Sequence, residues 1–242
     1  AVADMKEAIR LATAGKEKLL SIREEALRDL AIFMTESGNV QDAIEYFQRT
    51  AGNLQLYPKI LEGLGRQYER NVEPDKAIQV YESLLVTRPK EEAAFRFRVK
   101  LVDLDIRKGL YDHALGRVIG KENGKEGGDD IKLFASAEGE TETAWQNLRA
   151  MIRRTGTENH EKYRKTSDRK ALEVAEKFYT AYLDPILVLS DPRKERPEIQ
   201  MYLADVKREL GKAKEASELY KLVIASGEKK YSKEAAALWT AS

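Results

Sequence analysis

Apolar residues along this chain recur at the spacing of amphipathic helices, and the pattern repeats after a fixed interval. The segments 38–47 and 72–81 align without a gap, and each carries an alanine followed four residues later by an aromatic residue. The matching pairs, each 34 residues apart, are Ala43 with Ala77, Phe47 with Tyr81, Leu30 with Leu64 and Ala31 with Gly65. A period of this length predicts a stack of helix pairs, because one pair cannot bury its apolar face alone.

The residue types within the repeat have a packing logic. A small residue at Ala43 or Ala77 lets the second helix of a pair lie close against the first, and the aromatic residue one turn later fills the space between neighbouring pairs. This pattern resembles the tetratricopeptide repeat (TPR). The unit 58–91 carries Leu64, Gly65, Tyr68, Ala77, Tyr81 and Pro89, and the unit 24–57 fits as well except at Gln55, where the family has proline. The resemblance implies an all-α fold, a right-handed α-α superhelical solenoid of about 11–12 helices.

A third unit, 92–120, follows the pattern more loosely. Its second helix carries Ala114, which lies 37 residues after Ala77. Its first helix, 93–108, alternates apolar and charged residues, a pattern that by itself favours a β-strand. We predict a helix there, because the flanking repeats are helical and an isolated strand would have no partner to pair with.

The C-terminal half of the chain contains longer repeats, in which Ala175 and Ala216 are 41 residues apart. Between the two helices of the first pair we interpret 157–167 as an inserted stretch. The basic segment 153–170 around it is interpreted as a solvated inter-helix loop, with docking of an acidic partner segment as the alternative. Helix pairs are predicted at 141–190 and 197–226, and a partial helix at 232–242.

The polar, glycine-rich segment 121–130 predicts a flexible loop that divides an N-terminal TPR-like array, 1–120, from a C-terminal array, 131–242. At each end of the chain one predicted helix lacks a partner helix. These helices are either caps or the edges of a longer array, and the apolar residues near the C-terminus favour a fragment of a larger protein. The longer C-terminal repeats resemble TPR-like periplasmic proteins and lipoproteins of the bacterial envelope. That resemblance favours the periplasm over the cytoplasm and leaves both open.

Composition narrows the function classes. Charged residues make up 34% of the chain with a net charge of +1, which provides no overall field for nucleic acid or an anionic membrane. There is no cysteine, so disulfides and zinc–thiolate sites are excluded. The apolar run Ile186–Leu189 is far too short to span a bilayer. We favour core packing for this run over an exposed docking segment.

Several short motifs hint at chemistry, and we favour a structural explanation for each. Gly120–Glu126 has too few residues between its glycines for a phosphate-binding loop and lacks the Ser or Thr that holds magnesium. Asp103 and Asp105 lack the other ligands of a calcium loop, which favours the solvated side of a helix. His113 and His160 have no ligand-spaced partners, and a surface role is favoured for His113. We expect no catalytic, cofactor-binding or metal-binding residues.

The TPR resemblance implies a function as well as a fold. Its repeats form a concave surface, lined by the first helix of each pair, that holds a partner peptide or helix. Some TPR proteins clamp a terminal carboxylate there with Lys and Asn side chains, but Arg28, Ile32 and Gly63 occupy the corresponding positions here. The concave positions carried over from the family are Arg28, Ile32, Thr35, Glu36, Lys59, Glu62, Arg66, Glu69 and Arg70.

We therefore predict a non-catalytic protein–protein interaction scaffold with a protein or peptide partner. We expect no nucleic-acid partner and no direct membrane insertion, and a monomer or a part of a larger assembly. Two alternatives stay open at this point. One is a regulatory or structural repeat segment of a larger enzyme or sensor, and the other is an RNA-binding helical repeat.

Overall fold

A computed structural model describes most of the chain in two compact units. The described residues are 2–13, 20–51, 56–87, 92–119, 121–122, 125–126, 140–184, 187 and 195–240. The contacts between residues divide the chain into unit 1 (Ala1–Leu104) and unit 2 (Asp105–Ser242). The described secondary structure of each unit is helical, apart from one pair of two-residue strands in unit 2. No described helix is both long and apolar enough to cross a membrane.

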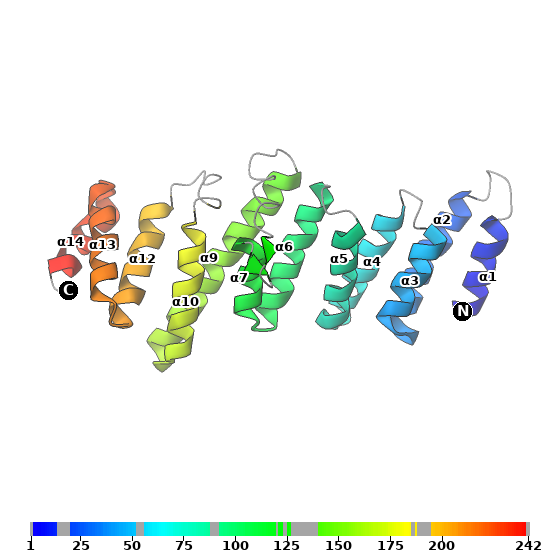
Figure 1. Ribbon diagram of the computed structural model, residues 1–242, viewed down its shortest axis with the longest axis horizontal. Coiled ribbons are helices and arrows are strands. Elements are labelled where there is room, and N and C mark those ends of the chain that lie inside the picture. Colours follow the sequence, from blue (N-terminus) through cyan, green and yellow to red (C-terminus); the bar gives the residue numbers. More distant parts are fainter. Residues whose placement is uncertain are drawn as a thin grey trace. The chain divides into compact units, whose positions relative to one another are not determined.

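Unit 1 consists of helices that stand side by side in chain order (Figure 1). The first helix of each pair is called an A helix and the second a B helix. The helix pairs predicted at 24–57 and 58–91 correspond to α2/α3 and α4/α5. The helices are α1 (Val2–Thr13), α2 (Leu20–Ser37), α3 (Val40–Ala51), α4 (Tyr57–Arg70), α5 (Pro74–Thr87) and α6 (Glu92–Arg107), whose last residues belong to unit 2.

Unit 2 continues the alternation of A and B helices. The predicted pairs at 141–190 and 197–226 are α9/α10 and α12/α13, with α14 after them. Within this unit α9 packs on α10, α10 on α12, and α13 on α14. The elements are α7 (Tyr111–Ile119), β1 (Lys121–Glu122), β2 (Lys125–Glu126), α9 (Glu140–Thr166), α10 (Arg169–Tyr182), α12 (Arg196–Glu209), α13 (Ala213–Ala225) and α14 (Lys229–Thr240).

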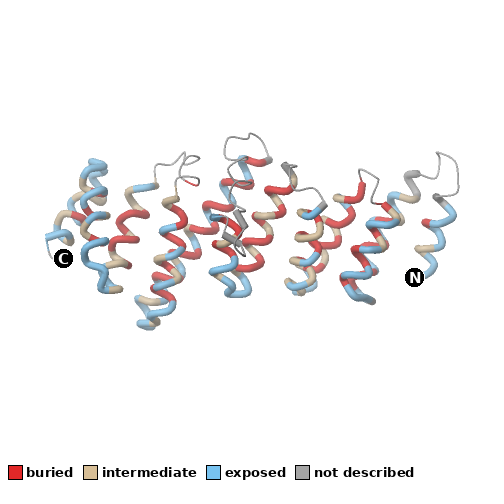
Figure 2. Tube along the Cα trace, viewed as in Figure 1, coloured by how far each residue is buried: buried red, intermediate tan, exposed pale blue. Residues whose placement is uncertain are grey.

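The small and aromatic residues of the repeat form the core of both units, as predicted. Buried positions recur along each helix between exposed ones (Figure 2). In unit 1 a Cβ on Gly65 would lie 2.9 Å from the ring of Tyr81, and in unit 2 a Cβ on Gly156 would lie 2.8 Å from the ring of Tyr179. The fit between an A-helix glycine and a B-helix tyrosine therefore joins α4 to α5 and α9 to α10. The buried motif residues are Ala43, Phe47, Ala77, Tyr81, Ala114, Ala175, Tyr179, Ala216 and Tyr220.

The turns that follow the A helices α4, α6 and α12 share one hydrogen-bond pattern. After α4, the Glu73 N–H donates to the Tyr68 carbonyl and the Val72 N–H to the Glu69 carbonyl. This is a Schellman motif, which requires a left-handed residue just after the helix. Gly109 and Gly211 fill that position after α6 and α12, with φ of 72° and 80°. Val72 fills it after α4 with φ of 59°, a conformation that is strained for a β-branched residue.

Two interpretations of the sequence are wrong. The stretch 157–167 is not an inserted loop, because α9 runs without interruption to Thr166 and the basic segment lies largely on this helix. Asp105 does not lie on the solvated side of its helix, since it is only 1% exposed. Its carboxylate accepts a hydrogen bond from the Arg117 guanidinium at 2.7 Å and contacts the exposed His113 ring at 2.7 Å, which ties the end of α6 to α7.

Other predictions are confirmed or stay predictions. The stretch 93–107 is helical despite its alternating pattern, and most of its apolar residues are buried. In the predicted loop 121–130, the strands β1 and β2 pair antiparallel, Lys121 with Glu126. The rest of that segment lies outside the described residues, so the division predicted there stays a prediction. Pro89, Gln55 and most of Ile186–Leu189 also lie outside them, although Leu187 is buried.

Candidate functional site: the A-helix groove of unit 1

The A helices of unit 1 enclose a hollow of about 660 Å³, which we call the A-helix groove. It is lined by α2, α4 and α6, and by no B helix. Two small residues, Ala31 on α2 and Gly63 on α4, line the hollow and leave space between the helices. A Cβ on Gly63 would meet no atom within 4 Å, so this glycine faces open space.

The groove follows from helical spacing on α4. Lys59, Glu62, Arg66 and Arg70 are three or four residues apart, which places them on one face of the helix. The facing turn of α2 contributes Ile32, whose side chain is large, apolar and 48% exposed. The groove thus combines a charged row with an accessible apolar position.

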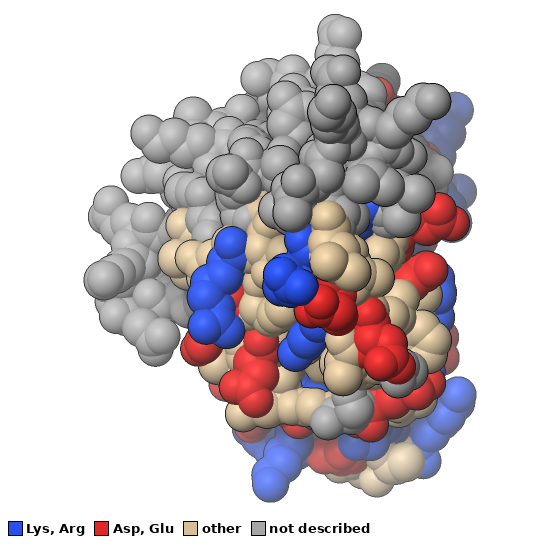
Figure 3. Space-filling view, turned by 90° about the vertical axis from the view of Figure 1, so that its right-hand side faces the viewer, with Lys and Arg blue, Asp and Glu red and all other residues tan. Residues whose placement is uncertain are grey.

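The groove carries an excess of positive charge. Five cationic side chains line it, from Arg28, Lys59, Arg66, Arg70 and Arg96, against the single carboxylate of Glu62. Glu62 already pairs with Arg96 at 3.2 Å and lies 3.9 Å from Arg66. Lys59 makes no ion pair or hydrogen bond to any described residue. By contrast, positive and negative side chains are interspersed on the end of unit 1 that α1 forms (Figure 3).

Of the nine predicted concave residues, six line the groove: Arg28, Ile32, Lys59, Glu62, Arg66 and Arg70. Glu36 is exposed and does not line it. Thr35 is only 5% exposed, and its hydroxyl donates to the Ile32 carbonyl and accepts from Asn71.

Glu69 is also engaged inside unit 1. It accepts hydrogen bonds from the Tyr81 hydroxyl and from Lys100. Burial, with the Glu69 carboxylate adding to it, raises the pKa of Tyr81. Thr35 on α2 and Glu69 on α4 are 34 residues apart and occupy the same position in two successive A helices. That position serves packing in both helices.

Sequence reasoning missed Arg96. It lies 34 residues after Glu62, which itself lies 34 residues after Arg28, so these three residues occupy one position in three successive A helices. The signal was present, because the first helix of the third pair keeps the 34-residue period. The 37-residue interval from Ala77 to Ala114 concealed it. The extra residues of that interval lie after the A helix, so they do not shift the position of Arg96.

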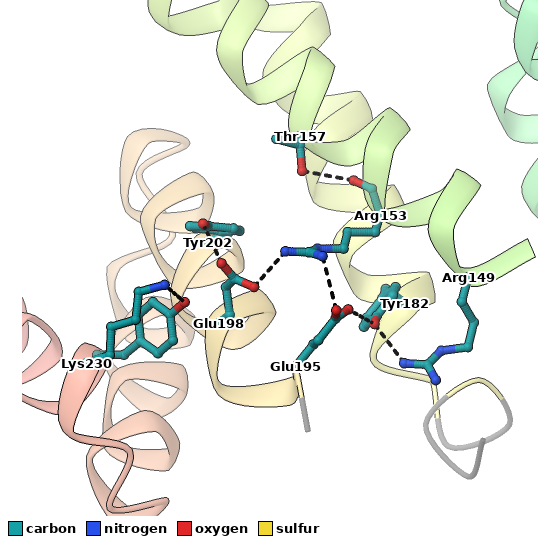
Figure 4. A network of polar contacts seen from close by, with 9 residues as sticks. Arg149, Arg153, Thr157, Tyr182, Glu195, Glu198, Tyr202 and Lys230 are labelled. Carbon is teal, nitrogen blue, oxygen red and sulfur yellow. Dashed lines mark hydrogen bonds and ion pairs between the residues drawn. The ribbon is translucent and has the colours of Figure 1, made fainter. Parts of the chain in front are cut away.

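Unit 2 uses the charges of its A helices differently (Figure 4). Arg153 on α9 donates to Glu195 at 3.1 Å and to Glu198 on α12 at 2.7 Å. The Tyr182 hydroxyl donates to Glu195 and accepts from Arg149, both at 2.7 Å. Burial raises the pKa of Tyr182, and its hydrogen bond to Glu195 adds to that effect. These charged side chains form ion pairs and hydrogen bonds that join α9, α10 and α12.

The helix pairs, the period of 34 residues and the fit of small against aromatic side chains define the chain as a TPR-like, all-α helical repeat protein. No protein-family model matches this sequence, and no curated protein matches it. Similar solved structures include a Podosopora anserina putative kinesin light chain with nearly identical TPR-like repeats, which is 16% identical. That match covers 86% of this chain and 96% of the other, with a TM-score of 0.36.

Two further structures are similar at the same level. A tetratricopeptide repeat protein from Parabacteroides merdae is 17% identical over 98% of this chain and 93% of its own, with a TM-score of 0.33. BtubC (BKLC) from P. vanneervenii is 15% identical over 94% and 91%, with a TM-score of 0.33. The fold described above rests on the geometry of the chain itself.

Proposed function

We propose that the chain is a protein-interaction scaffold whose A-helix groove in unit 1 binds an acidic peptide segment of a partner protein. The observation that carries this proposal is the charge of the groove, five cations against one carboxylate that is already paired. A cleft lined by charges of one sign focuses their electric field, because its protein walls have a low dielectric constant, and this raises the local concentration of a ligand of opposite charge. The volume of the groove, about 660 Å³, suits several side chains of a peptide.

The arginines determine the preferred ligand chemistry. A guanidinium presents a planar fork of donors that matches a carboxylate in a bidentate manner, and it stays charged at every accessible pH. Arg66 and Arg70 lie one turn apart on α4, at a spacing that successive acidic residues of a bound segment can meet. The exposed Ile32 offers an apolar contact beside them. The expected ligand is therefore a segment that alternates acidic and apolar residues.

The test is fluorescence anisotropy with two labelled twelve-residue peptides. One alternates glutamate and leucine, and the other replaces every glutamate with glutamine. We expect the glutamate peptide to bind and to bind less tightly as salt is raised, because salt screens the charges. Equal binding of the glutamine peptide, or displacement of the glutamate peptide by a uridine oligonucleotide of similar length at equal concentration, would overturn the proposal.

Two variants locate the site. Arg66→Glu is expected to weaken binding about tenfold, which equals about 1.4 kcal/mol. Arg49→Glu on the B helix α3 makes the same charge change outside the groove and should leave the affinity within twofold. Gly63→Leu should block the peptide by filling the groove, while the helix retains its stability because Gly63 faces open space. If Gly63→Leu binds like the unmodified protein, the groove is not the site.

A further inference from the structure

The C-terminal part of α9 forms a small hollow in unit 2. This helix has 27 residues, whereas its partner α10 has 14. Where α9 meets α10 and α12, a hollow of about 100 Å³ opens. We call it the His160 pocket. It is lined by Thr157, His160, Glu161, Arg164, Tyr179 and Tyr202.

His160 is a buried polar side chain without a polar partner. It is only 5% exposed, and its ring meets Tyr179 edge to face with the ring centres 6.0 Å apart. No described residue forms a hydrogen bond or ion pair with it. Buried polar groups are almost always hydrogen-bonded, because an unmet donor or acceptor costs about 1–3 kcal/mol. A polar side chain that faces a hollow in this state can hydrogen-bond to water or to a ligand there.

The charge state of His160 restricts what that ligand can be. Burial lowers the pKa of His160 to about 4, and the nearby Arg164 adds to the effect while Glu209 on α12 opposes it. At neutral pH the ring is therefore uncharged and offers one N–H donor and one acceptor nitrogen. Arg164 lies four residues further along α9, on the same face, and has no ion-pair partner among the described residues.

The other lining groups are already engaged. The Tyr202 hydroxyl donates to Glu198 at 2.9 Å, and the Tyr179 hydroxyl lies against that of Thr157. Glu161 lies 3.8 Å from Lys165 on its own helix. This leaves two donors without a protein partner among the described residues, the N–H of buried His160 and the guanidinium of exposed Arg164, at a hollow with aromatic walls. A single carboxylate on a short apolar stem fits this set. A phosphate dianion fits it less well, because one arginine beside Glu161 leaves most of its charge unbalanced.

We propose that the His160 pocket is a second binding site, which takes one carboxylate of a partner peptide between the Arg164 guanidinium and the N–H of neutral His160. The site lies within unit 2 and uses none of the residues of the A-helix groove. The carboxylate comes either from an acidic side chain or from a chain terminus. Two small acids that mimic these sources distinguish them by which one binds more tightly.

The experiment follows the imidazole C–H resonances by NMR, since the chain has only two histidines. The probes are N-acetylglycine for a terminal carboxylate, N-acetylaspartate α-amide for a side-chain carboxylate, and N-acetylasparagine amide as the neutral match. At pH 6 at least one acid should shift the His160 resonances saturably and leave those of the exposed His113 unchanged. The acid that binds more tightly identifies the source of the carboxylate.

The pH dependence has a definite sign. A bound carboxylate stabilises the imidazolium, so it should raise the pKa of His160 from its value of about 4. Binding should therefore tighten as pH falls from 7 toward 5, and it should weaken as pH rises. The groups that face His160 from the surrounding helices are Arg164, Glu161, Tyr179, Tyr202 and Glu209, and the tyrosines do not titrate in this range.

Matched variants separate binding from packing. Arg164→Gln should weaken binding of the acid at least tenfold, and Glu161→Gln should strengthen it by removing a competing carboxylate. Arg154→Gln is the control, an exposed arginine on the same helix that pairs with Glu158. Equal shifts with the neutral probe, no shift with either acid, or unchanged binding in Arg164→Gln would overturn the proposal. None of these outcomes bears on the A-helix groove, because that site is tested by the Arg66→Glu and Gly63→Leu variants in unit 1.

Discussion

The two units share a framework but differ in what their A helices do with charge. In unit 1, Arg28, Glu62 and Arg96 occupy one position in three successive A helices, and the sum is an excess of cations around an open groove. In unit 2, Arg153 is held between two carboxylates and Arg149 bonds a buried hydroxyl. When the packing residues of a fold repeat, its charged positions can differ between repeats. They can line a binding groove in one place and form ion pairs between helices in another.

Exposure accounts for the difference. The Arg153 side chain is 33% exposed, and its partners Glu195 and Glu198 are 16% and 17% exposed. The Arg66 side chain is 54% exposed, and among the described residues its one carboxylate partner is Glu62 at 3.9 Å. Removal of one partner from an ion pair that is screened from water is costly, because it leaves a buried charge uncompensated, whereas exposed pairs contribute little to stability. Charges of the second kind can be redirected to a ligand without loss of stability.

The largest expected effect tests this contrast directly. Arg153→Ala should lower the free energy of unfolding of unit 2 by about 2 kcal/mol, because two half-buried carboxylates lose their cation. Arg66→Ala in unit 1 should change stability by less than about 0.5 kcal/mol. Urea unfolding by tryptophan fluorescence reports on unit 2, since Trp145 and Trp239 both lie there, and circular dichroism reports on both units. Equal effects of the two variants would remove the distinction.

A smaller effect tests what the units share. Gly65→Ala should destabilise unit 1 by about 1–2 kcal/mol, because the new methyl group would overlap the ring of Tyr81. Gly156→Ala should do the same in unit 2 through Tyr179. The control is Gly63→Ala, two residues from Gly65 on the same helix, which meets open space and should stabilise the helix by about 0.5–1 kcal/mol. The measurement is the urea midpoint by circular dichroism. Stabilisation by Gly65→Ala would contradict the packing role of this position.

The sequence was sufficient to predict most of the fold, because its signals are local and repeated. The pairing of Ala77 with Tyr81 and the small residue at Gly65 predicted both the helices and their contact. The stretch 157–167 was interpreted wrongly because α9 is longer than the other A helices. The other helix pairs have no residues that align with it, so comparison between repeats offered no guide there. Helix formers such as Glu158, Glu161 and Lys162 continue α9 without a breaker until Ser167.

Side-chain roles were harder to predict than helices. Position in the repeat placed Arg66 and Arg70 on the groove, but it also placed Glu69 there, and this residue turns inward to the Tyr81 hydroxyl. Spacing along a helix resolves the face on which a residue lies, and it does not resolve which neighbours from other helices compete for its polar atoms. For the same reason Asp105 gave no sign of its pairing with Arg117, twelve residues away on the next helix.

The smallest expected effect concerns the turns and compares one position in the two units. Val72 in unit 1 and Gly211 in unit 2 both occupy the left-handed position of a Schellman motif, and Val72 is 83% exposed, so it contributes almost no packing. Relief of the strained backbone favours glycine there by about 1–2 kcal/mol, and the greater freedom of glycine in the unfolded chain offsets part of this gain. Val72→Gly should therefore raise the free energy of unfolding by about 0.5 kcal/mol. Gly211→Val should lower it by a similar or larger amount, although a Cβ there would meet no atom within 4 Å. The pair of variants separates backbone strain from side-chain packing, and a loss of stability in Val72→Gly would show that the valine side chain has a role in the turn that its exposure conceals.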